Sequence, residues 1–430
     1  MSIPRPQPDQ PQPPRPEHDA AVRILQTLRG HGHTAYLAGG CVRDILLGEE
    51  PKDYDVATDA RPEQIAEYFK KTASVGAAFG VMLVRDFGPA IEVASFRSDG
   101  VYSDTRRPDT IEFSSPREDA RRRDFTINAL FMDPLSEEPN EVIDYVCGLA
   151  DIRDRVLRAV GDPADRLRED HLRALRAVRF AARYELTIEQ RTKDAIKDHA
   201  LELAGVSIER IGEEIKRMLT HPSRERACEL IDELGLDDAI FADSAAFDNT
   251  IMNLLDTRVP YPAALVALAL GRGHGFMDAP GPICNHYRKC LDLSNADRDA
   301  MRTILEIMRC YHGDWGSLSV AAKKRLAGRE HADMALLVYG AICGKSKSDR
   351  AATIIEEVME LAEKHGGINP EPLISGGDLI EQGLEPGPRF KGILDDVYDA
   401  QLEGRVKDKG QALSMAADLV RQESRSRAGK

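Results

Sequence analysis

The spacing of apolar residues changes near residue 149, and this change restricts the possible folds more than any other feature. Before it, short apolar runs bounded by turn residues predict strands. After it, apolar residues recur every three or four positions, which is typical of helices. The elements expected in the first part are a helix, Ala20–Arg29, and five strands, Ala35–Ala38, Tyr54–Ala57, Gly80–Asp86, Ile91–Phe96 and Phe125–Met132. The sequence therefore predicts an N-terminal α+β domain followed by an all-α remainder.

Length and charge restrict the partners of this chain. Its 430 residues are enough for about two to four domains. The net charge of -14 excludes a basic coat over the whole surface, so a polyanion must meet a local patch or a bound cation. Two basic strips late in the chain are candidates, although solvated helix faces are the alternative interpretation: Lys323, Lys324, Arg325 and Arg329, and then Arg405, Lys407 and Lys409.

Segments that would direct the chain to a membrane are not evident in the sequence. No apolar run approaches the roughly 18–20 residues that a membrane helix needs. Residues 1–17 are rich in proline and lack the apolar core of a signal peptide, so we expect a disordered arm there. The seven cysteines form an odd, scattered set, which favours reduced thiols in a cytoplasmic protein.

A Gly39-Gly40 pair joins the first expected strand to a short helix that contains Arg43. Glycines let backbone N–H groups approach an anion, and the start of a helix favours negative charge. A guanidinium one turn later adds donors suited to a phosphate. This element predicts a phosphate site, with plain packing as the alternative.

Asp53 and Asp55 supply the second chemical signal. On a strand, residues two apart point to the same face, so the two carboxylates would repel each other unless a cation lies between them. Glu92, among apolar residues of another expected strand, could add a third carboxylate. The alternative is a polar turn before a strand. We predict a Mg²⁺ site held by Asp53 and Asp55, with Asp53, Asp55 and Glu92 as catalytic residues.

Four segments together resemble one family. Residues 39–58, GGCVRDILLGEEPKDYDVAT, look like the opening motif of the tRNA nucleotidyltransferase and bacterial poly(A) polymerase family, in the polymerase-β-like superfamily. Residues 122–130, 169–182 and 207–215 are similar to its later motifs, in the same order. The resemblance implies a polymerase-β-like head with a mixed sheet and helices, then an all-α neck, body and tail. The implied divisions are a proline-rich arm (1–17), a catalytic head (18–148), a nucleotide-selecting neck (149–222), a body (223–360) and a tRNA-binding tail (361–430).

Asp170 and Arg173 are three residues apart, which would make them neighbours on a helix. A carboxylate only accepts hydrogen bonds and a guanidinium only donates them, so the pair matches the pairing edges of cytosine and adenine and mismatches uracil and guanine. Glu169 would orient Arg173 or cap the helix. The resemblance assigns further residues to nucleotide binding, namely Arg123, Asp124, Asn128, Arg176 and Arg179. For Arg179 a structural ion pair is the alternative, because helical drift would turn it away from Asp170.

The resemblance implies template-independent addition of C, C and A to the 3′ end of tRNA, from CTP and ATP, by two-metal nucleotidyl transfer. Residues 102–108 look like the flexible loop that CC-only enzymes lack, with Thr105 where glycine is usual. A basic phosphate motif expected in a poly(A) polymerase is missing at residues 75–80. The alternatives are A-only addition, poly(A) synthesis and, in another class, a catalytically dead nucleotide- or RNA-binding protein.

Overall fold

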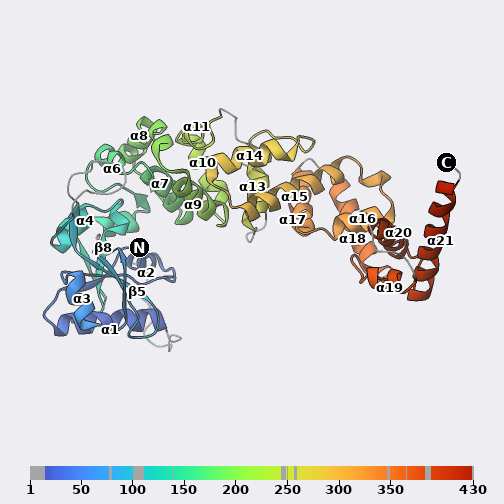
Figure 1. Cartoon of the computed structure of the whole chain (residues 1–430). Helices are drawn as coiled ribbons and strands as arrows, with labels where there is room; N and C mark the ends of the chain where they lie inside the picture. Colours follow the sequence, from blue (N-terminus) through green and yellow to red (C-terminus); the bar gives the residue numbers. More distant parts are fainter. Residues whose placement is uncertain are drawn as a thin grey trace. The chain divides into compact units, whose positions relative to one another are not determined.

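The computed structural model forms two compact units (Figure 1). The first comprises Met1–Met218 and Arg226–Asp243, and the second comprises Leu219–Glu225 and Ser244–Lys430. Strands lie in the first unit, and the described part of the second is helical. The structure describes residues 15–76, 80–99, 111–138, 140–243, 248, 250–255, 259–345, 349–364, 366–382 and 389–428.

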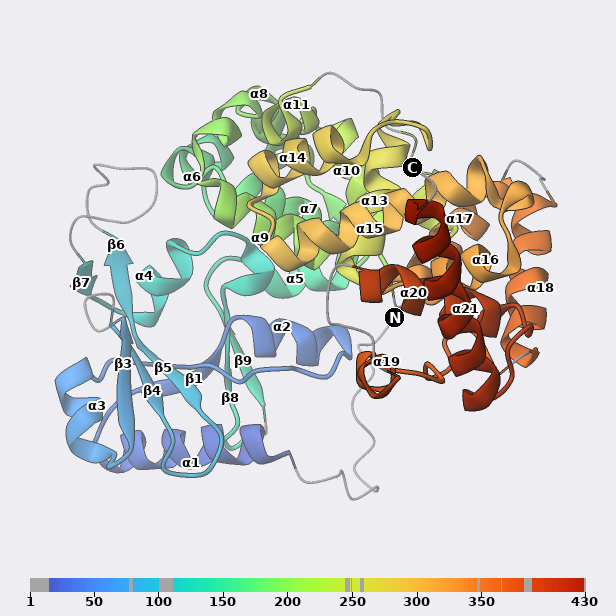
Figure 2. The ribbon, with the colours of Figure 1, turned by 45° about the vertical axis from the view of Figure 1, so that its right-hand side comes forward.

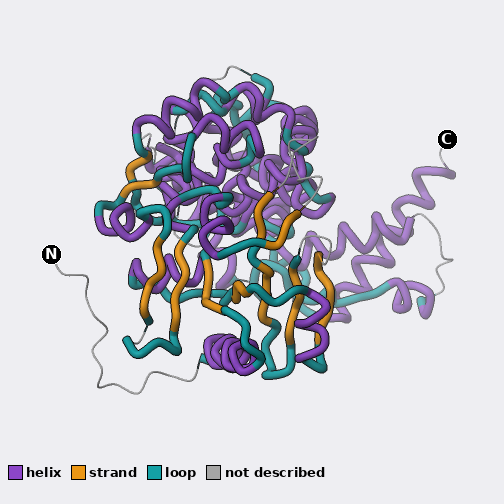
Figure 3. The backbone as a smooth tube through the Cα atoms, turned by 90° about the vertical axis from the view of Figure 1, so that its left-hand side faces the viewer, coloured by secondary structure: helices purple, strands orange, loops and turns teal. Residues whose placement is uncertain are grey.

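The strands of the head lie side by side in a sheet (Figure 3). This sheet has seven strands, in the order β3-β4-β5-β2-β1-β8-β9. The β2–β5 pair is parallel and the other neighbouring pairs are antiparallel. This pairing confirms the α+β head with a mixed sheet. The strands are β1 (Ala35–Ala38), β2 (Val56–Thr58), β3 (Thr72–Gly76), β4 (Val81–Val84), β5 (Ile91–Ser95), β8 (Leu130–Asp133) and β9 (Glu141–Asp144), with a separate ribbon of β6 (Arg97–Asp99) and β7 (Ile111–Phe113).

Helix α1 (Pro16–Gly30) packs against β1, β2 and β5 (Figure 2). Its buried residues, including Ile24, Leu25 and Leu28, recur at helical spacing, so their burial holds the helix on the sheet. The helix is longer than predicted because Pro16 is preorganised for the first helical turn. Residues 16 and 17 therefore belong to α1, and the prediction that they are part of a disordered arm is wrong. Of the rest of that predicted arm, residues 1–14 lie outside the described residues, and Arg15 directly precedes α1.

The predictions for β1 and β5 agree with the sheet to within one residue, the prediction Gly80–Asp86 is three residues longer than β4, and β3 and β9 were not predicted. The prediction for Tyr54–Ala57 is shifted, since β2 begins at Val56, although the Asp55 carbonyl already accepts a bond from Ala38 N–H (3.0 Å). The prediction of one strand over Phe125–Met132 is wrong in its first half, where a 3₁₀ turn, η2 (Thr126–Asn128), precedes β8. The hairpin predicted at Gly88-Pro89 joins β4 and β5 and is confirmed.

Helix α7 (Arg173–Arg183) divides the neck into an apolar and a basic side. Leu175, Val178 and Ala182 are buried, whereas arginines recur every third position from Arg173 to Arg179. The core thus fixes α7 and leaves its guanidinium groups to border the head. The other helices of this unit are α2 (Gly40–Leu47), α3 (Pro62–Tyr68), α4 (Pro116–Arg121), α5 (Gly148–Arg153), α6 (Pro163–Glu169), α8 (Gln190–Asp198), α9 (Ile208–Leu219), α10 (Arg224–Glu233) and α11 (Asp237–Phe241), with the short strands β10 (Val156–Leu157) and β11 (Thr187–Ile188) between them.

The second unit confirms the helical body and tail. Its most apolar helix, α13 (Tyr261–Gly271), is buried along nearly all its length. A separate apolar cluster that includes Leu379, Val397 and Ala412 joins the last three helices. No described helix is long and apolar enough to cross a membrane. The remaining helices are α12 (Thr250–Asn253), α14 (Pro280–Leu291), α15 (Asn295–His312), α16 (Val320–Ala327), α17 (Ala332–Lys345), α18 (Arg350–Glu363), α19 (Gly376–Glu381), α20 (Arg389–Leu402) and α21 (Lys409–Ala428).

Candidate active site

A polar cavity of about 500 Å³ lies in the first unit, where α2 and η2 meet α7. Every residue predicted to bind nucleotide borders it, although these residues come from three separate stretches of the sequence. The fold therefore brings the motif residues of head and neck to one place. The lining residues are Gly39, Gly40, Arg43, Arg122, Arg123, Asp124, Asn128, Asp170, Arg173, Arg176, Arg179 and Phe180.

Gly39 forms the turn that starts α2, with φ of +69°. A Cβ atom at this position would lie 2.7 Å from Arg123 Nη1 and 3.5 Å from the Asn128 carbonyl oxygen. Only glycine therefore fits both the backbone angle and the contact. Gly40 needs no such freedom, because its nearest neighbour would be Arg43 Nη2 at 3.7 Å.

Arg43 is buried between α2, η2 and α7, and its guanidinium is held on several sides. It donates to Asp44 Oδ1 from Nε (2.9 Å) and Nη2 (2.7 Å), to Asn128 Oδ1 (2.6 Å) and to the Tyr184 hydroxyl (2.7 Å). It also lies 5.0 Å from the ring centre of Phe180. The guanidinium is therefore fixed in direction at the cavity wall.

Asp124 links the head to the arginine side of α7. Its Oδ2 accepts from Arg176 Nε (2.8 Å) and Nη2 (2.6 Å), and its Oδ1 accepts from Asn128 Nδ2 (3.0 Å) and Phe125 N–H (2.8 Å). Burial alone would raise the pKa of Asp124, but the positive charge of Arg176 and these hydrogen bonds outweigh it and lower the pKa to about 2. Asp124 is thus a charged partner of Arg176.

Arg123 is held by a buried acid on α4. It donates from Nε (3.1 Å) and Nη2 (2.9 Å) to Asp119 Oδ2, and from Nη1 to the Asn128 carbonyl (3.0 Å). Asp119 is only 2% exposed, and its pKa is lowered by Arg123 and Arg122 despite the opposing effect of burial. This clamp holds Arg123 against Gly39 at the edge of the cavity.

Asp170 is not on the same helix as Arg173, so that prediction is wrong. Asp170 ends α6 with an extended backbone (φ −157°, ψ 102°), and α7 begins at Arg173. Its carboxylate accepts from Leu172 N–H (3.1 Å) and Arg210 Nη2 (2.7 Å). The Asx-type bond to Leu172 competes with helix formation and breaks the helix there.

Arg173 is oriented by Glu169, as one of the two sequence-based alternatives predicted. Its Nη1 donates to Glu169 Oε2 (2.6 Å) and to the Arg166 carbonyl (2.7 Å). Although Asp170 and Arg173 lie on different elements, both border the cavity. A carboxylate and a guanidinium therefore still face the same space.

Arg179 both forms an ion pair and borders the cavity. Its Nε donates to Glu214 Oε2 (2.6 Å), and Glu214 on α9 is 3% exposed. The expectation that helical drift would turn Arg179 away from Asp170 is wrong, because Asp170 lies outside α7 and does not follow the rotation of that helix.

The charges of Asp53 and Glu92 both act on Asp55, and none of the three residues lines the cavity. Tyr54 is buried between the two aspartates, and the parallel β2–β5 register, extended by one residue, sets Glu92 next to Asp55. The pKa of Asp55 is raised to about 6, first by burial and then by the charges of Glu92 and Asp53, while Arg123 opposes the shift. Arg123 also borders the cavity, so Asp55 and the nucleotide site share one positively charged neighbour.

These carboxylates fit a divalent cation in part. The charges of Glu92 and Asp53 raise the pKa of Asp55, and a cation between these carboxylates would remove that repulsion. Among the described residues, however, no three His, Cys, Asp or Glu side chains gather closely enough to hold a metal ion. The donor set therefore fits a cation that takes further ligands from a bound substrate.

Sequence reasoning missed several residues that support the site. Asp119 and Glu214 hold arginines of the cavity, and Tyr184 contacts Arg43. Phe180 lies within residues 169–182, which resemble a family motif, and the sequence assigned it no role, yet it borders the cavity. A buried arginine needs an acceptor, so the dense arginines of these motifs were the signal that such partners exist.

One residue of the predicted basic strips, Lys324, is not available to a polyanion. Lys324 is fully buried and donates to the carbonyls of Lys364 and Gly367 (both 2.7 Å), so the prediction that it belongs to an RNA-binding strip is wrong. The loop at residues 102–108, and residues 77–79 of the segment 75–80, lie outside the described residues.

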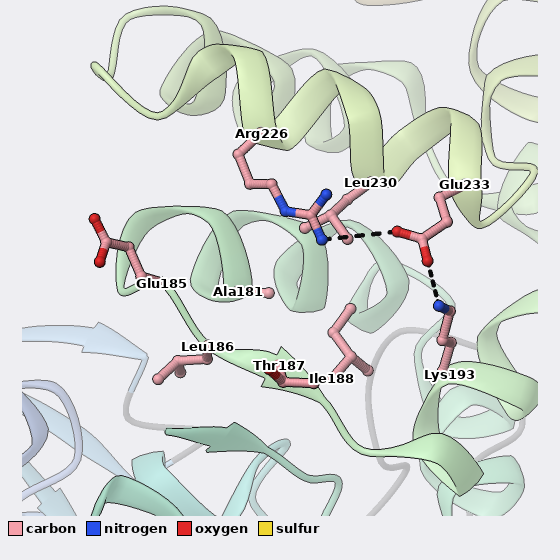
Figure 4. Close-up of a pocket in the computed structure, with 9 residues that line it drawn as sticks. All are labelled: Ala181, Glu185, Leu186, Thr187, Ile188, Lys193, Arg226, Leu230 and Glu233. Carbon is pink, nitrogen blue, oxygen red and sulfur yellow. Dashed lines mark hydrogen bonds and ion pairs between the residues drawn. The ribbon is translucent and has the colours of Figure 1, made fainter. Parts of the chain in front are cut away.

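A second cavity of about 320 Å³ lies elsewhere in this unit, between α10 and the segment from α7 to α8 (Figure 4). Glu233 pairs there with Lys193 and with Arg226 (3.7 Å). These charges satisfy one another, and none of the predicted site residues lines this cavity.

Comparison with known proteins supports the interpretation of the motifs. Residues 35–158 match the family model of the poly(A) polymerase head domain, and residues 185–247 match that of a probable RNA- and SrmB-binding site of polymerase A. A CCA-adding enzyme of Bacillus licheniformis is 43% identical over 411 residues, which cover 94% of this chain and 98% of that protein. One from Levilactobacillus brevis is 31% identical over 417 residues, covering 93% and 97%.

Solved structures agree with this assignment. The Bacillus stearothermophilus CCA-adding enzyme in complex with CTP has a TM-score of 0.76 at 29% identity, over 96% of this chain and all of that one. The Thermotoga maritima CCA-adding enzyme complexed with tRNA has a TM-score of 0.67 at 18% identity, over 94% and 95% of the two chains, and shows a shared fold. The chain belongs to the family of CCA-adding enzymes, which are nucleotidyltransferases with a poly(A) polymerase head domain.

Proposed function

We propose that this chain adds C, C and A to the 3′ end of tRNA from CTP and ATP. The observation that carries the proposal is the cavity in which Asp170 and Arg173 face the same space as the arginines of head and neck. It gives one place for a base and for a triphosphate. Both the tRNA substrate and the bacterial relatives lead us to propose a cytoplasmic location as well.

Base choice in this proposal depends on hydrogen-bond direction. Asp170 offers acceptors and Arg173 offers donors, which suits the amino group and ring nitrogen of cytosine or adenine. Uracil and guanine would leave buried polar groups unpaired, at a cost of about 1–3 kcal/mol for each group. The bonds from Arg210 to Asp170 and from Arg173 to Glu169 fix both side chains before a nucleotide enters.

The triphosphate in this proposal lies along the Gly39 turn. Arg43 and Arg123 both border the cavity there, and each is held by a buried acid. Their charges would offset those of the phosphates without reorganising, because the guanidinium groups are already positioned. The start of α2, an eight-residue helix, adds backbone N–H groups that favour an anion.

Transfer in this proposal joins the tRNA 3′-oxygen to the α-phosphate and releases pyrophosphate, without a covalent enzyme intermediate. Asp53 and Asp55 would hold Mg²⁺, with Glu92 beside them. The ion supplies charge neutralisation for the phosphates and lowers the pKa of a coordinated hydroxyl. Asp55 acts in its ionised form, which its raised pKa of about 6 still permits at neutral pH.

The test uses three tRNA transcripts, ending before CCA, after C and after CC, each with CTP, ATP and Mg²⁺. The proposal predicts that all three are completed to CCA and then extended no further. Extension of only the last transcript would show A addition, and long A tails on any RNA would show poly(A) synthesis. Nucleotide binding without extension of any transcript would identify a binding protein.

A further inference from the structure

Tyr184 joins the neck to the head through its hydroxyl group. It is the residue after the last turn of α7, is 4% exposed, and donates to Asp44 Oδ1 on α2 (2.7 Å). The same hydroxyl accepts from Arg43 Nη2 (2.7 Å). A phenylalanine would occupy nearly the same volume. The two polar contacts of the hydroxyl are therefore what a tyrosine adds at this buried position.

Two aromatic rings also contact the Arg43 guanidinium. Its guanidinium lies 4.6 Å from the ring centre of Tyr184 and 5.0 Å from that of Phe180, and the two rings stack with centres 6.3 Å apart. Asp44 balances the charge and is itself 6% exposed. Arg43 is thus held by cation–π contacts, an ion pair and a hydrogen bond to the tyrosine hydroxyl.

A run of hydrogen bonds connects Arg43 to other residues of the cavity. Its Nη1 donates to Asn128, whose amide donates to Asp124, which binds Arg176. Two of the cavity arginines, Arg43 and Arg176, are therefore joined by one run of hydrogen bonds. Burial raises the pKa of Tyr184 to about 12, so the hydroxyl keeps its proton for Asp44 at neutral pH.

We propose that Tyr184, together with Asp44, is a positioning residue that holds Arg43 in the direction needed to bind the triphosphate of the incoming nucleotide. This inference rests on the proposed function of the cavity. Arg43 borders the cavity beside Gly39 and Gly40, whereas the base would be read by Asp170. Loss of the Tyr184 and Asp44 contacts to Arg43 therefore weakens the binding of CTP and ATP alike and leaves the choice of base unchanged.

The experiment compares the Tyr184→Phe variant with the unaltered chain in single-nucleotide addition. Removing a hydrogen bond to a charged group predicts a KM about tenfold higher for both CTP and ATP. The kcat and the preference for C over U are expected to change less than twofold. The matched control is Tyr68→Phe, which removes a hydroxyl that contacts His33 Nε2 (3.2 Å) in the same unit, away from the cavity lining.

A double-mutant cycle with Arg43→Lys tests whether Tyr184 acts through Arg43. The inference predicts that Tyr184→Phe changes KM less than twofold further when it is combined with Arg43→Lys. If the two residues acted independently, the fold-changes in KM of the single variants would multiply. Asp44→Asn provides a second route should Tyr184→Phe fold poorly, and it too predicts a raised KM for both nucleotides. Thermal unfolding of each variant checks its fold.

An unchanged KM in folded Tyr184→Phe and Asp44→Asn, or multiplicative effects in the cycle, would overturn the inference while the unaltered chain still extended tRNA. A loss of activity at unchanged KM would show a structural role only and would also overturn it. Failure of the unaltered chain to extend tRNA would instead refute the proposed function, so the two failures are distinguishable.

Discussion

Replacing Gly39 by alanine tests the geometry at the centre of the site. The positive φ costs a residue with a Cβ atom about 1–2 kcal/mol. The new Cβ would also lie 2.7 Å from Arg123 Nη1, so the guanidinium must move and lose its bond to the Asn128 carbonyl. A hydrogen bond to a charged group contributes about 1.5–3 kcal/mol, so the backbone and the lost hydrogen bond together cost about 2.5–5 kcal/mol.

Gly48→Ala is the control for a positive φ (80°) without a close contact, because a Cβ atom there would have no neighbour within 4 Å. The two backbones differ in ψ, which is 15° at Gly48 and −116° at Gly39, so each variant is compared with the unaltered chain. Urea unfolding measures the backbone cost in both variants, and steady-state addition with CTP measures the effect of moving Arg123. We expect Gly48→Ala to lose stability with a kcat/KM near that of the unaltered chain, and Gly39→Ala to lose about 30-fold in kcat/KM, which corresponds to about 2 kcal/mol. Equal kcat/KM values in the two variants would refute the reasoning.

Three further predictions concern individual acids. Asp124→Asn breaks the pair with Arg176 and is expected to lower the free energy of unfolding in urea by about 2–4 kcal/mol at pH 7. Because the pKa of Asp124 is lowered to about 2, its contribution is complete above the unfolded value of about 4 and is lost as the pH falls toward 2, so the difference from Asp124→Asn should narrow over that interval. Glu214→Gln leaves Arg179 without its buried counter-charge and should cost about 1–3 kcal/mol in the same assay, whereas no loss would contradict the pairing. Asp53→Ala should fold normally, since Asp53 is exposed, yet incorporate nucleotide at least about 100-fold more slowly, and near-normal incorporation would refute its assignment as a metal ligand.

Much of the head could be predicted because its signals are local. The Gly39-Gly40 turn, the strand Ala35–Ala38 and the hairpin at Gly88-Pro89 each depend on neighbouring residues, and the structure has all three. The shift of β2 and the 3₁₀ turn at Thr126–Asn128 could not be predicted from the spacing of apolar residues alone. In the turn, Thr126 donates to Asp151 (2.6 Å), a partner 25 residues away.

The partners of the arginines depend on the tertiary fold. Arg176 meets Asp124 across 52 residues, and Arg43 meets Tyr184 across 141. Helical spacing could place arginines on one side of α7 but could not say which acid each would meet. The break at Asp170 has a local cause, its bond to Leu172 N–H, but this bond competes with a plausible helix and sequence alone does not decide between them.

The preference of Asp170→Asn for CTP over UTP tests the central claim most directly, namely that protein side chains read the base. An asparagine keeps an acceptor for Leu172 N–H but can also donate, which suits the carbonyl oxygen of uracil. The account predicts that the ratio of kcat/KM for CTP to that for UTP, on tRNA lacking CCA, falls at least about tenfold. A ratio equal to that of the unaltered chain would contradict it.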